Sequence, residues 1–445
     1  MSELGHTFRA VLVPLTALAV SAAMAACAAE SSDSPEPPAL SQGNPATPVL
    51  TAPAVTAAAS TAAASTAPAL SSPSAVIESM SDAAPSSDAP PRRVTAAVTV
   101  EPTLPAGGPV PRQFRIADAT FVGTSDGWMI GTGKCLDGSG KFCPAELRTI
   151  DGGDDWVSVP NPPAGVVSGT AGRGVCGEPC IDGIRFATDR IGYAFGPFAL
   201  FMTTDGTHWK KEPGGAEALE TLDGNVIRVS EPAVGTCPDS GCPFRVQIAP
   251  IGSESWRDVL PTGSTLVGYG VWLTRVGSAA YLLLAANSAT TASGEVTLLY
   301  SSADDGQHWV NRGSPCGLGV DATYITSAVD GSVTVVCSGP GGYTSDYTAT
   351  STDGGVSFRA APGTLGVITG VGAASASVLL AVADGVFRSG DGGRSWQRML
   401  GAPKDSLAEI LGFESATTGR VLNLFGDTIW TTPDAGFTWI ANVFT

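Results

Sequence analysis

The sequence predicts an all-β fold, a single β-propeller of seven four-stranded blades, on three observations. A turn motif with an aspartate, one or two glycines and a final aromatic residue recurs along the chain. Short runs of alternating apolar and polar residues flank the copies, as β-strands do. Successive copies lie roughly 40 to 55 residues apart, which is the length of one four-stranded blade.

The clearest copy of the motif runs from Ser389 to Trp396 and forms a turn between two antiparallel strands. The Asp391 carboxylate can accept backbone N–H groups of the turn, and the glycines supply positive φ angles without a clash at Cβ. The Ser389 hydroxyl adds a local hydrogen bond, and the Trp396 indole is large enough to pack on a neighbouring sheet. The motif is therefore expected to shape a turn rather than to catalyse a reaction.

Four other copies keep the whole pattern, one copy is a residue short, and one keeps only its tryptophan and its place. The full copies are residues 149–156, 302–309, 351–358 and 432–439, the short copy is 203–209, and the eroded copy is 251–256. Whether the eroded copy marks a blade decides between six blades and seven. Six aspartates are assigned to these turns as structural residues rather than general acids: Asp151, Asp205, Asp304, Asp353, Asp391 and Asp434.

This motif resembles the Asp box, or BNR repeat, of sialidases, sortilin-type receptors, xyloglucanases and a photosystem II assembly factor. The resemblance covers about residues 113–445 and implies a propeller with an Asp box between the third and fourth strands of each blade. It does not imply one activity, because the same turn occurs both in enzymes and in proteins that have no catalytic role.

The first segment of the chain is expected to direct export. An apolar stretch from Ala10 to Ala23 suits a signal peptide at residues 1–26. Residues Met24 to Cys27 resemble the lipobox of bacterial lipoproteins, which implies lipidation of Cys27. The protein would then sit in the bacterial cell envelope, on the outer side of the cytoplasmic membrane or on the cell surface. An ordinary secretory signal cut after Ala26 is the alternative.

The second segment, residues 27–112, is expected to be a lipidated cysteine followed by a disordered tether. From Ala28 to Gln113 the chain has no Phe, Tyr, Trp or further Cys, and Ala, Ser, Thr and Pro dominate. Such a composition cannot bury enough apolar surface to offset its conformational entropy. It also permits O-linked sugars on Ser and Thr. The propeller is assigned to residues 113–445.

Four strands, a to d, can be placed in the first and last blades. The first blade has them at residues 114–122, 127–131, 146–150 and 156–159, and the last at 408–413, 419–425, 428–431 and 439–444. The chain enters on an inner strand and leaves on an outer one, so no exchange of strands between the two ends is expected. How the ring closes is left open.

Eight cysteines besides Cys27 are expected to form four disulfides, because their number is even and the chain is exported. A zinc site is the alternative, which irregular spacing and an oxidising compartment disfavour, so neither a metal nor a cofactor is expected. Nearest-neighbour pairing joins Cys135 with Cys143, Cys176 with Cys180, Cys237 with Cys242, and Cys316 with Cys337.

The strand order places all four disulfides on one face of the propeller, with Cys316 at the start of a strand a and Cys337 at the end of a strand b. The a-to-b and c-to-d turns lie on one face, here the Asp-box face, and the b-to-c and d-to-a loops lie on the other, here the loop face. Long loops also belong to the loop face, at residues 162–183, 231–243, 287–295 and 339–347. Loops fixed in advance lose less entropy on binding, which favours a binding or scaffolding role. Protection from proteases is the alternative.

A sialidase-type glycoside hydrolase is the alternative function. Residues Phe114 to Ala117 match the early Phe/Tyr-Arg-Ile-Pro signature of that family except for its proline, and Asp118 follows directly. The pattern is equally explained if Arg115 points outward between two buried neighbours on a strand. No tyrosine follows Tyr347, whereas the family's nucleophile falls late, so we favour binding over catalysis. The three histidines, in the signal or in Asp boxes, offer no Ser/His/Asp arrangement: His6, His208 and His308.

The charge of the chain argues against nucleic acid as a partner. From Arg112 onward there are 33 acidic and 21 basic residues, a net charge of −12. A phosphate backbone would be repelled, and no run of basic residues offsets this. The expected partners are the membrane, through the lipid, and a protein or glycan at the loop face of a monomer.

Overall fold

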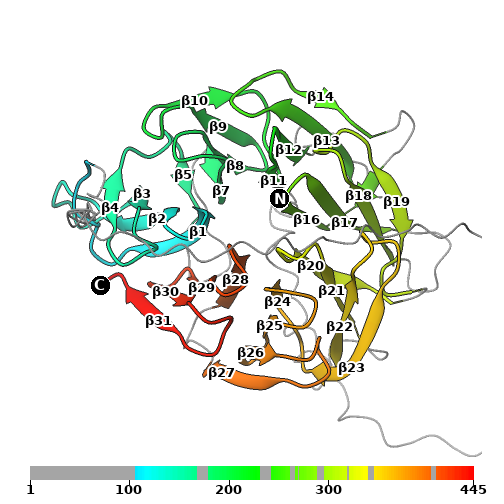
Figure 1. Cartoon of the computed structure of the whole chain (residues 1–445). Coiled ribbons are helices and arrows are strands. Elements are labelled where there is room, and N and C mark those ends of the chain that lie inside the picture. The colour runs from blue at the N-terminus through cyan, green and yellow to red at the C-terminus, as the bar shows by residue number, and fades with distance from the viewer. Residues whose placement is uncertain are drawn as a thin grey trace, which may run out of the picture. The chain divides into compact units, whose positions relative to one another are not determined.

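The computed structural model describes residues 106–167, 179–230, 242–260, 266–268, 270–287, 295–317, 320–338, 345–401 and 407–445. Within these ranges seven antiparallel sheets, blades 1 to 7, follow one another around a ring, and no helix occurs (Figure 1). The predicted all-β propeller is therefore confirmed, with seven blades. The described ranges contain no helix that could cross a membrane.

Each blade runs from an inner strand a to an outer strand d. Blades 1 to 3 consist of β1 (Arg115–Val122), β2 (Asp126–Lys134), β3 (Phe142–Thr149), β4 (Val157–Val159); β7 (Gly183–Phe186), β8 (Gly192–Gly196), β9 (Ala199–Thr203), β10 (Trp209–Glu212); and β11 (Ala218–Thr221), β12 (Asn225–Ser230), β13 (Cys242–Pro250), β14 (Arg257–Asp258). Blade 3 has a fifth strand, β15 (Leu266–Gly268), paired with the start of β13. A short parallel pair, β5 (Gly165–Val166) and β6 (Cys180–Ile181), precedes blade 2.

The remaining four blades repeat the same meander. They consist of β16 (Gly270–Val276), β17 (Ala279–Asn287), β18 (Glu295–Ser302), β19 (Val310–Gly313); β20 (Ala322–Ser327), β21 (Val333–Cys337), β22 (Asp346–Ser351), β23 (Arg359–Leu365); β24 (Gly370–Ala373), β25 (Leu379–Val382), β26 (Gly385–Ser389), β27 (Gln397–Gly401); and β28 (Leu407–Phe413), β29 (Gly419–Leu424), β30 (Thr428–Thr432), β31 (Ile440–Val443). The eroded motif copy forms the turn between β13 and β14, so it does mark a blade.

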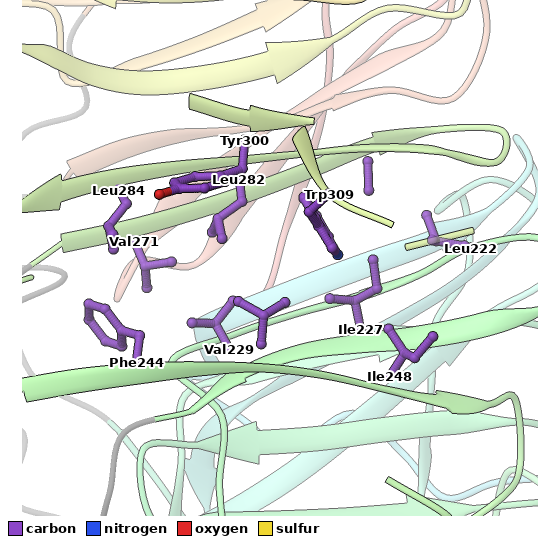
Figure 2. Packing of buried hydrophobic residues seen from close by; sticks show 12 residues of the cluster. Leu222, Ile227, Val229, Phe244, Ile248, Val271, Leu282, Leu284, Tyr300 and Trp309 are labelled. Carbon is purple, nitrogen blue, oxygen red and sulfur yellow. The ribbon is translucent and has the colours of Figure 1, made fainter. Parts of the chain in front are cut away.

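The hydrophobic core lies between neighbouring blades. Figure 2 shows the cluster between blades 3 and 4, in which Phe244 and Ile248 face Val271, Leu282 and Trp309. Strand b of a blade is covered on both faces, which explains why apolar residues run continuously through it rather than alternating with polar ones. In blade 4 strand b is β17, and Leu282, Leu283 and Leu284 in sequence are all fully buried.

The aromatic residue of each Asp box packs against the preceding blade. Trp309 of blade 4 belongs to the core cluster with blade 3, and Trp156 of blade 1 packs against Phe444 of blade 7 in a cluster that also contains Leu422. In both of these boxes the indole N–H also donates to the glycine carbonyl oxygen of its own turn, at 2.9 Å and 3.1 Å respectively. The motif therefore joins a turn to the interface between two blades.

The ring closes by contacts between blades 7 and 1, and no strand is exchanged. The Phe425 N–H donates to the Ile116 carbonyl oxygen at 2.7 Å, and the Ile116 N–H donates to the Gly426 carbonyl oxygen at 2.9 Å. On the outer side of blade 1, Gly108 forms a two-way backbone bridge with Ser158 of β4. The expected entry on an inner strand and exit on an outer strand are both observed.

Arg420 of β29 reinforces this closure from inside the protein. Its side chain is fully buried and donates to the carbonyl oxygens of Gly152 at 2.7 Å and Thr124 at 2.9 Å, both in blade 1. Its guanidinium lies 3.5 Å from the centre of the Phe121 ring. The Glu414 carboxyl lies 3.3 Å from the Arg420 Nε and offsets the buried charge when it is ionised.

Candidate functional site

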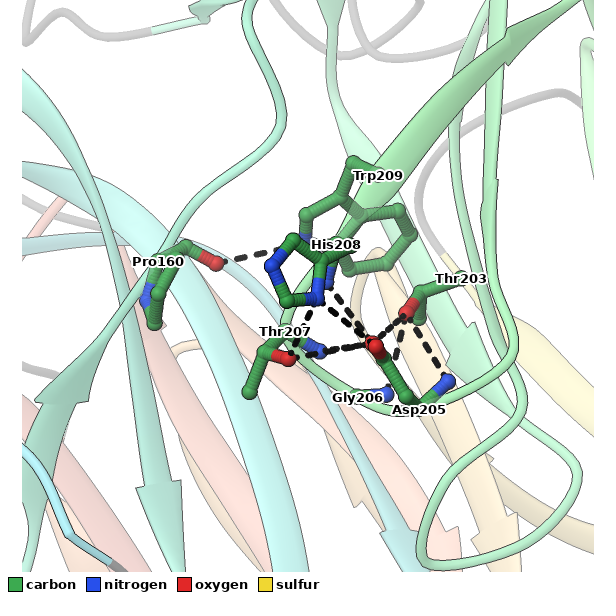
Figure 3. Close-up of polar contacts among 7 residues, drawn as sticks. All are labelled: Pro160, Thr203, Asp205, Gly206, Thr207, His208 and Trp209. Atoms are coloured by element: carbon green, nitrogen blue, oxygen red, sulfur yellow. Dashed lines mark hydrogen bonds and ion pairs between the residues drawn. The ribbon is translucent and has the colours of Figure 1, made fainter.

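The Asp boxes are c-to-d turns, and Figure 3 shows the copy in blade 2. The Thr203 hydroxyl donates to the Asp205 carboxylate at 3.2 Å and accepts the Gly206 N–H at 2.9 Å. The carboxylate also accepts the backbone N–H of His208 at 2.8 Å and contacts the His208 ring nitrogen at 2.7 Å. These bonds, the His208 N–H first, hold the pKa of Asp205 well below its ordinary value.

Three further Asp-box carboxylates titrate in the same direction. Side-chain donors at the seventh position of the boxes, His308, Ser357 and Ser395, are the main cause. They lower the pKa to about 2 at each of Asp304, Asp353 and Asp391. A general acid needs a raised pKa, so these carboxylates suit the permanent acceptor of a turn.

The two histidines of the propeller lie on these turns, and each ring contacts the aspartate of its own Asp box. The His308 ring nitrogen contacts the Asp304 carboxylate at 2.5 Å, as His208 contacts Asp205. In the part of the chain that the structure describes, no group of three His, Cys, Asp or Glu side chains could hold a metal ion.

The loop face carries both disulfides whose two cysteines are described. Cys135 bonds to Cys143 in the b-to-c hairpin of blade 1, with Cα atoms 5.1 Å apart. Cys316 bonds to Cys337 across blade 5, with Cα atoms 5.7 Å apart. These are two of the four predicted pairs.

The other two predicted pairs involve residues outside the described ranges. Cys180 is disulfide-bonded, but its predicted partner Cys176 lies outside the described residues, as does Cys237, the predicted partner of Cys242. Cys316 does not begin strand a as predicted, because β20 begins only at Ala322 and Cys316 belongs to the d-to-a loop before it. It still lies on the loop face.

The disulfide hairpin of blade 1 presents two apolar side chains to solvent. Leu136 is 72% exposed and Phe142 is 50% exposed. Two other large apolar side chains on the loop face are also exposed, Phe198 in the b-to-c turn of blade 2 and Val367 between blades 5 and 6. Sequence reasoning predicted the Cys135–Cys143 disulfide but did not single out these apolar residues. An apolar residue directly beside a cysteine of a short loop was the available signal.

A cavity of about 350 Å³ lies beside the Cys316–Cys337 disulfide. Cys316 and Tyr347 line it on the side of the loop face, and Val356 and Phe358 of an Asp box line it on the other. Arg312, whose Nε donates to the Ser301 hydroxyl at 2.8 Å, contributes to its wall. The cavity thus runs along the outer strands between blades 4 and 5.

A charged cluster crosses the inner strands of blades 1 to 3. Arg185 of β7 donates to Asp118 of β1 at 2.7 Å and to Glu220 of β11 at 3.0 Å. Burial, followed by the charge of Asp118, raises the pKa of the nearby Asp182 to about 7. Sequence reasoning named only Asp118 of this cluster, because its other members come from separate blades.

The residues that resemble the sialidase signature supply no arginine that is left without an acidic partner. Phe114 and Ile116 are fully buried, whereas Arg115 points to the surface and pairs with Asp427 at 3.5 Å. Arg185, the arginine on the neighbouring inner strand, is already held by two carboxylates. A site that binds a substrate carboxylate needs unpaired guanidinium groups.

The sequence matches no protein-family model and no curated protein. Among solved structures, YCF48 from Cyanidioschyzon merolae is similar at 14% identity with a TM-score of 0.49, over 73% of this chain and 97% of that one. YCF48 bound to D1 peptide is similar at 16% identity with a TM-score of 0.46, over 73% and 95% of the two chains.

An enzyme with the same kind of fold is also similar. Trypanosoma rangeli sialidase in complex with the inhibitor DANA shares 16% identity and a TM-score of 0.34, over 51% of this chain and 48% of the sialidase. Each likeness is one of fold. By its own sheet topology, the chain is a seven-bladed propeller with Asp-box turns.

Proposed function

We propose that this protein is an exported, lipid-anchored binding or scaffolding module that holds a protein or glycan partner at the loop face of its propeller. The observation that carries the proposal is the disulfide hairpin of blade 1, which fixes exposed Leu136 and Phe142 in place. A surface that is already ordered loses less conformational entropy when a partner binds.

The loop face also has the freedom to vary that a binding surface needs. The Asp-box turns are committed to the fold, because their polar groups bond within the turn and their aromatic rings pack between blades. Loops on the other face carry no such repeated constraint, so their sequences can serve recognition. Phe198 and Val367 are exposed there in addition to the hairpin residues.

The partner-binding proposal can be tested with a photo-crosslinking residue in intact cells. Placed at Phe198 or Val367 on the loop face, it should give a defined crosslinked product. Placed at Val329, which is 48% exposed in the a-to-b turn of blade 5 on the opposite face, it should give none. Equal crosslinking from Val329 would contradict the assignment of the face.

The membrane anchor rests on the lipobox-like residues Met24 to Cys27. Cys27→Ala should block lipid-dependent processing and release the protein from the membrane fraction. Labelling with a fatty-acid analogue followed by fractionation checks this. Normal processing of the variant, with retention in membranes, would contradict lipidation at Cys27.

A sialidase-type activity has less support from the geometry. Arg115 and Arg185 are both ion-paired, and the two carboxylates of Asp118 and Glu220 around Arg185 give the inner-strand cluster an excess of negative charge. That charge disfavours a sialic acid carboxylate. A fluorogenic sialoside should therefore be left intact by the purified protein, and its hydrolysis would favour the enzyme instead.

A further inference from the structure

The hairpin that carries the first disulfide projects beyond the rest of its blade. The inner strand β1 has its last partner at Thr132, but β2 and β3 continue to pair as far as Lys134 and Phe142. β2 has 9 residues, whereas the corresponding β8 of blade 2 has 5. Residues 133–143, here called the stapled hairpin, therefore form a convex projection on the loop face.

The projecting end is apolar and is held rigidly. Leu136, at 72%, is the most exposed large apolar side chain among the described residues. The disulfide closes the loop at its base, where the Cys135 N–H also donates to the Lys141 carbonyl oxygen at 2.9 Å. At the tip, the Ser139 N–H donates to the Asp137 carboxylate at 2.8 Å. The exposed side chains are thus presented on an ordered turn.

Basic groups surround the apolar tip. The Lys134 amine lies 4.2 Å from the centre of the Phe142 ring and donates to the Gly140 carbonyl oxygen. Lys141 is exposed in the loop, and exposed Arg112 is adjacent because its carbonyl oxygen accepts the Lys134 N–H at 2.8 Å. Asp137 is the one acidic residue of the hairpin. Three bases against one acid are a local reversal in a chain of net charge −17.

The stapled hairpin also adjoins the point where the chain enters the propeller. Residues that precede β1 run along it, since Arg112 bonds to Lys134 and Pro111 packs on Gly133. The predicted lipid anchor lies on that same amino-terminal side. A tip on a chain that is already tethered to a membrane meets lipid at a high effective concentration, so a weak affinity suffices.

We propose that the stapled hairpin docks into the surface of an anionic lipid membrane. The proposal rests on the anchored module proposed above and adds a lipid surface to the protein or glycan partner of its loop face. Leu136 and Phe142 enter the boundary between headgroups and acyl chains, and Lys134, Lys141 and Arg112 contact lipid phosphates. A convex apolar tip with a basic rim fits a deformable lipid surface, and long basic side chains can keep their charges at the headgroups.

Vesicle flotation with residues 28–445 tests this, because that chain lacks the signal and Cys27 but contains every blade and the contacts that close the ring. It should float with phosphatidylcholine vesicles that contain phosphatidylglycerol and not with pure phosphatidylcholine. Binding should weaken as salt is added. The double variant Leu136→Ser, Phe142→Ser should lower the affinity for these vesicles by at least about tenfold, because each change removes apolar area from the tip.

A matched control separates this hairpin from general surface stickiness. Val356 on an Asp-box turn is 61% exposed and Ile440 on β31 is 59% exposed, so Val356→Ser, Ile440→Ser removes comparable apolar surface elsewhere. This control should float like the unaltered chain. Absence of vesicle binding, equal binding to neutral vesicles, or equal loss in the control would each overturn the proposal.

Failure of lipid docking and failure of partner binding give different results. Loop-face crosslinks from Phe198 that persist without any vesicle binding would reject lipid docking and keep partner binding. Vesicle binding that depends on Leu136 and Phe142, with no loop-face crosslinks, would support lipid docking and reject the partner. Intact folding of each variant is checked by its near-UV circular dichroism.

Discussion

The hydroxyl residue, rather than the aspartate, is the buried member of each Asp box. Ser389 is 1% exposed, and its hydroxyl donates to Asp391 and accepts the buried Gly393 N–H at 2.8 Å. The Asp391 carboxylate lies at the surface and gathers the Arg394 and Ser395 N–H groups. Sequence reasoning gave the main structural role to the aspartate, whereas the structure divides that role between the two residues.

Ser389→Ala should therefore lower the free energy of unfolding by about 1 to 3 kcal/mol, because the buried Gly393 N–H loses its acceptor. Ser389→Thr keeps the hydroxyl, as at Thr149 and Thr432 in other blades, and should unfold close to the unaltered protein. Denaturant unfolding measures both. Asp391→Ala should shift the midpoint in the same direction by less. An unchanged midpoint for Ser389→Ala would remove the hydroxyl from this role.

At the scale of strands and loops, sequence reasoning succeeded wherever the signal was local. The eight strands predicted for the first and last blades all form, because each is bounded by turn residues and packs in an alternating or continuous apolar pattern. The parallel pair β5–β6 and the extra strand β15 were not predicted, since both depend on pairing with a distant segment. The same reason hid Arg185 and Arg420, whose partners lie in other blades.

The two described disulfides should differ in their contribution to stability according to the loops they close. Cys316–Cys337 spans 21 residues in sequence and Cys135–Cys143 spans 8. Chain entropy gives about 3 kcal/mol for the first and about 2.5 kcal/mol for the second. Denaturant unfolding of the two double-serine variants measures the difference. A larger loss from the shorter loop would show that contacts at the stapled hairpin, and not loop entropy, set the order.

The two remaining pairs stay predictions that peptide mapping without reduction can check. Fragments linking Cys176 with Cys180 and Cys237 with Cys242 are expected. A crossed pairing would join the segment that precedes blade 2 to a segment within blade 3. It would require the two loops to meet across the loop face.

At the scale of the whole ring, the described residues share no strand between blades 7 and 1, so closure rests on two backbone hydrogen bonds and on side chains. Arg420 links blade 7 to two carbonyl oxygens of blade 1 and is fully buried. Arg420→Met should lower the free energy of unfolding by roughly 3 to 5 kcal/mol, since it strands those groups and the Glu414 carboxyl. Arg398→Ala, which removes a half-exposed arginine paired with Asp384 within blade 6, should have little effect on the denaturant midpoint. Equal effects would show that closure rests on packing alone.

The carboxyl groups of the ring also predict how its stability depends on pH. Burial raises the pKa of Glu414 to about 7, and the nearby Arg420 lowers it only in part. Between the ordinary value of 4.5 and about 7, the folded state therefore keeps a proton that the unfolded chain releases. A state that binds more protons loses stability as pH rises, so the ring should become less stable through that window. Asp182, with a pKa also raised to about 7, acts in the same direction.

The Asp boxes act in the opposite direction at lower pH. Asp304, Asp353 and Asp391 have folded pKa values of about 2 against an ordinary 3.8, so their contribution is lost as pH falls through that interval. Stability should therefore be greatest at about pH 4 to 5, between the two windows. Glu414→Gln removes the Glu414 part of the upper slope and leaves the part that Asp182 contributes, so its melting temperature should fall less than that of the unaltered protein between pH 5 and pH 8. Melting curves for the two proteins that stay parallel across this range would mean that Glu414 is already ionised in the closed ring.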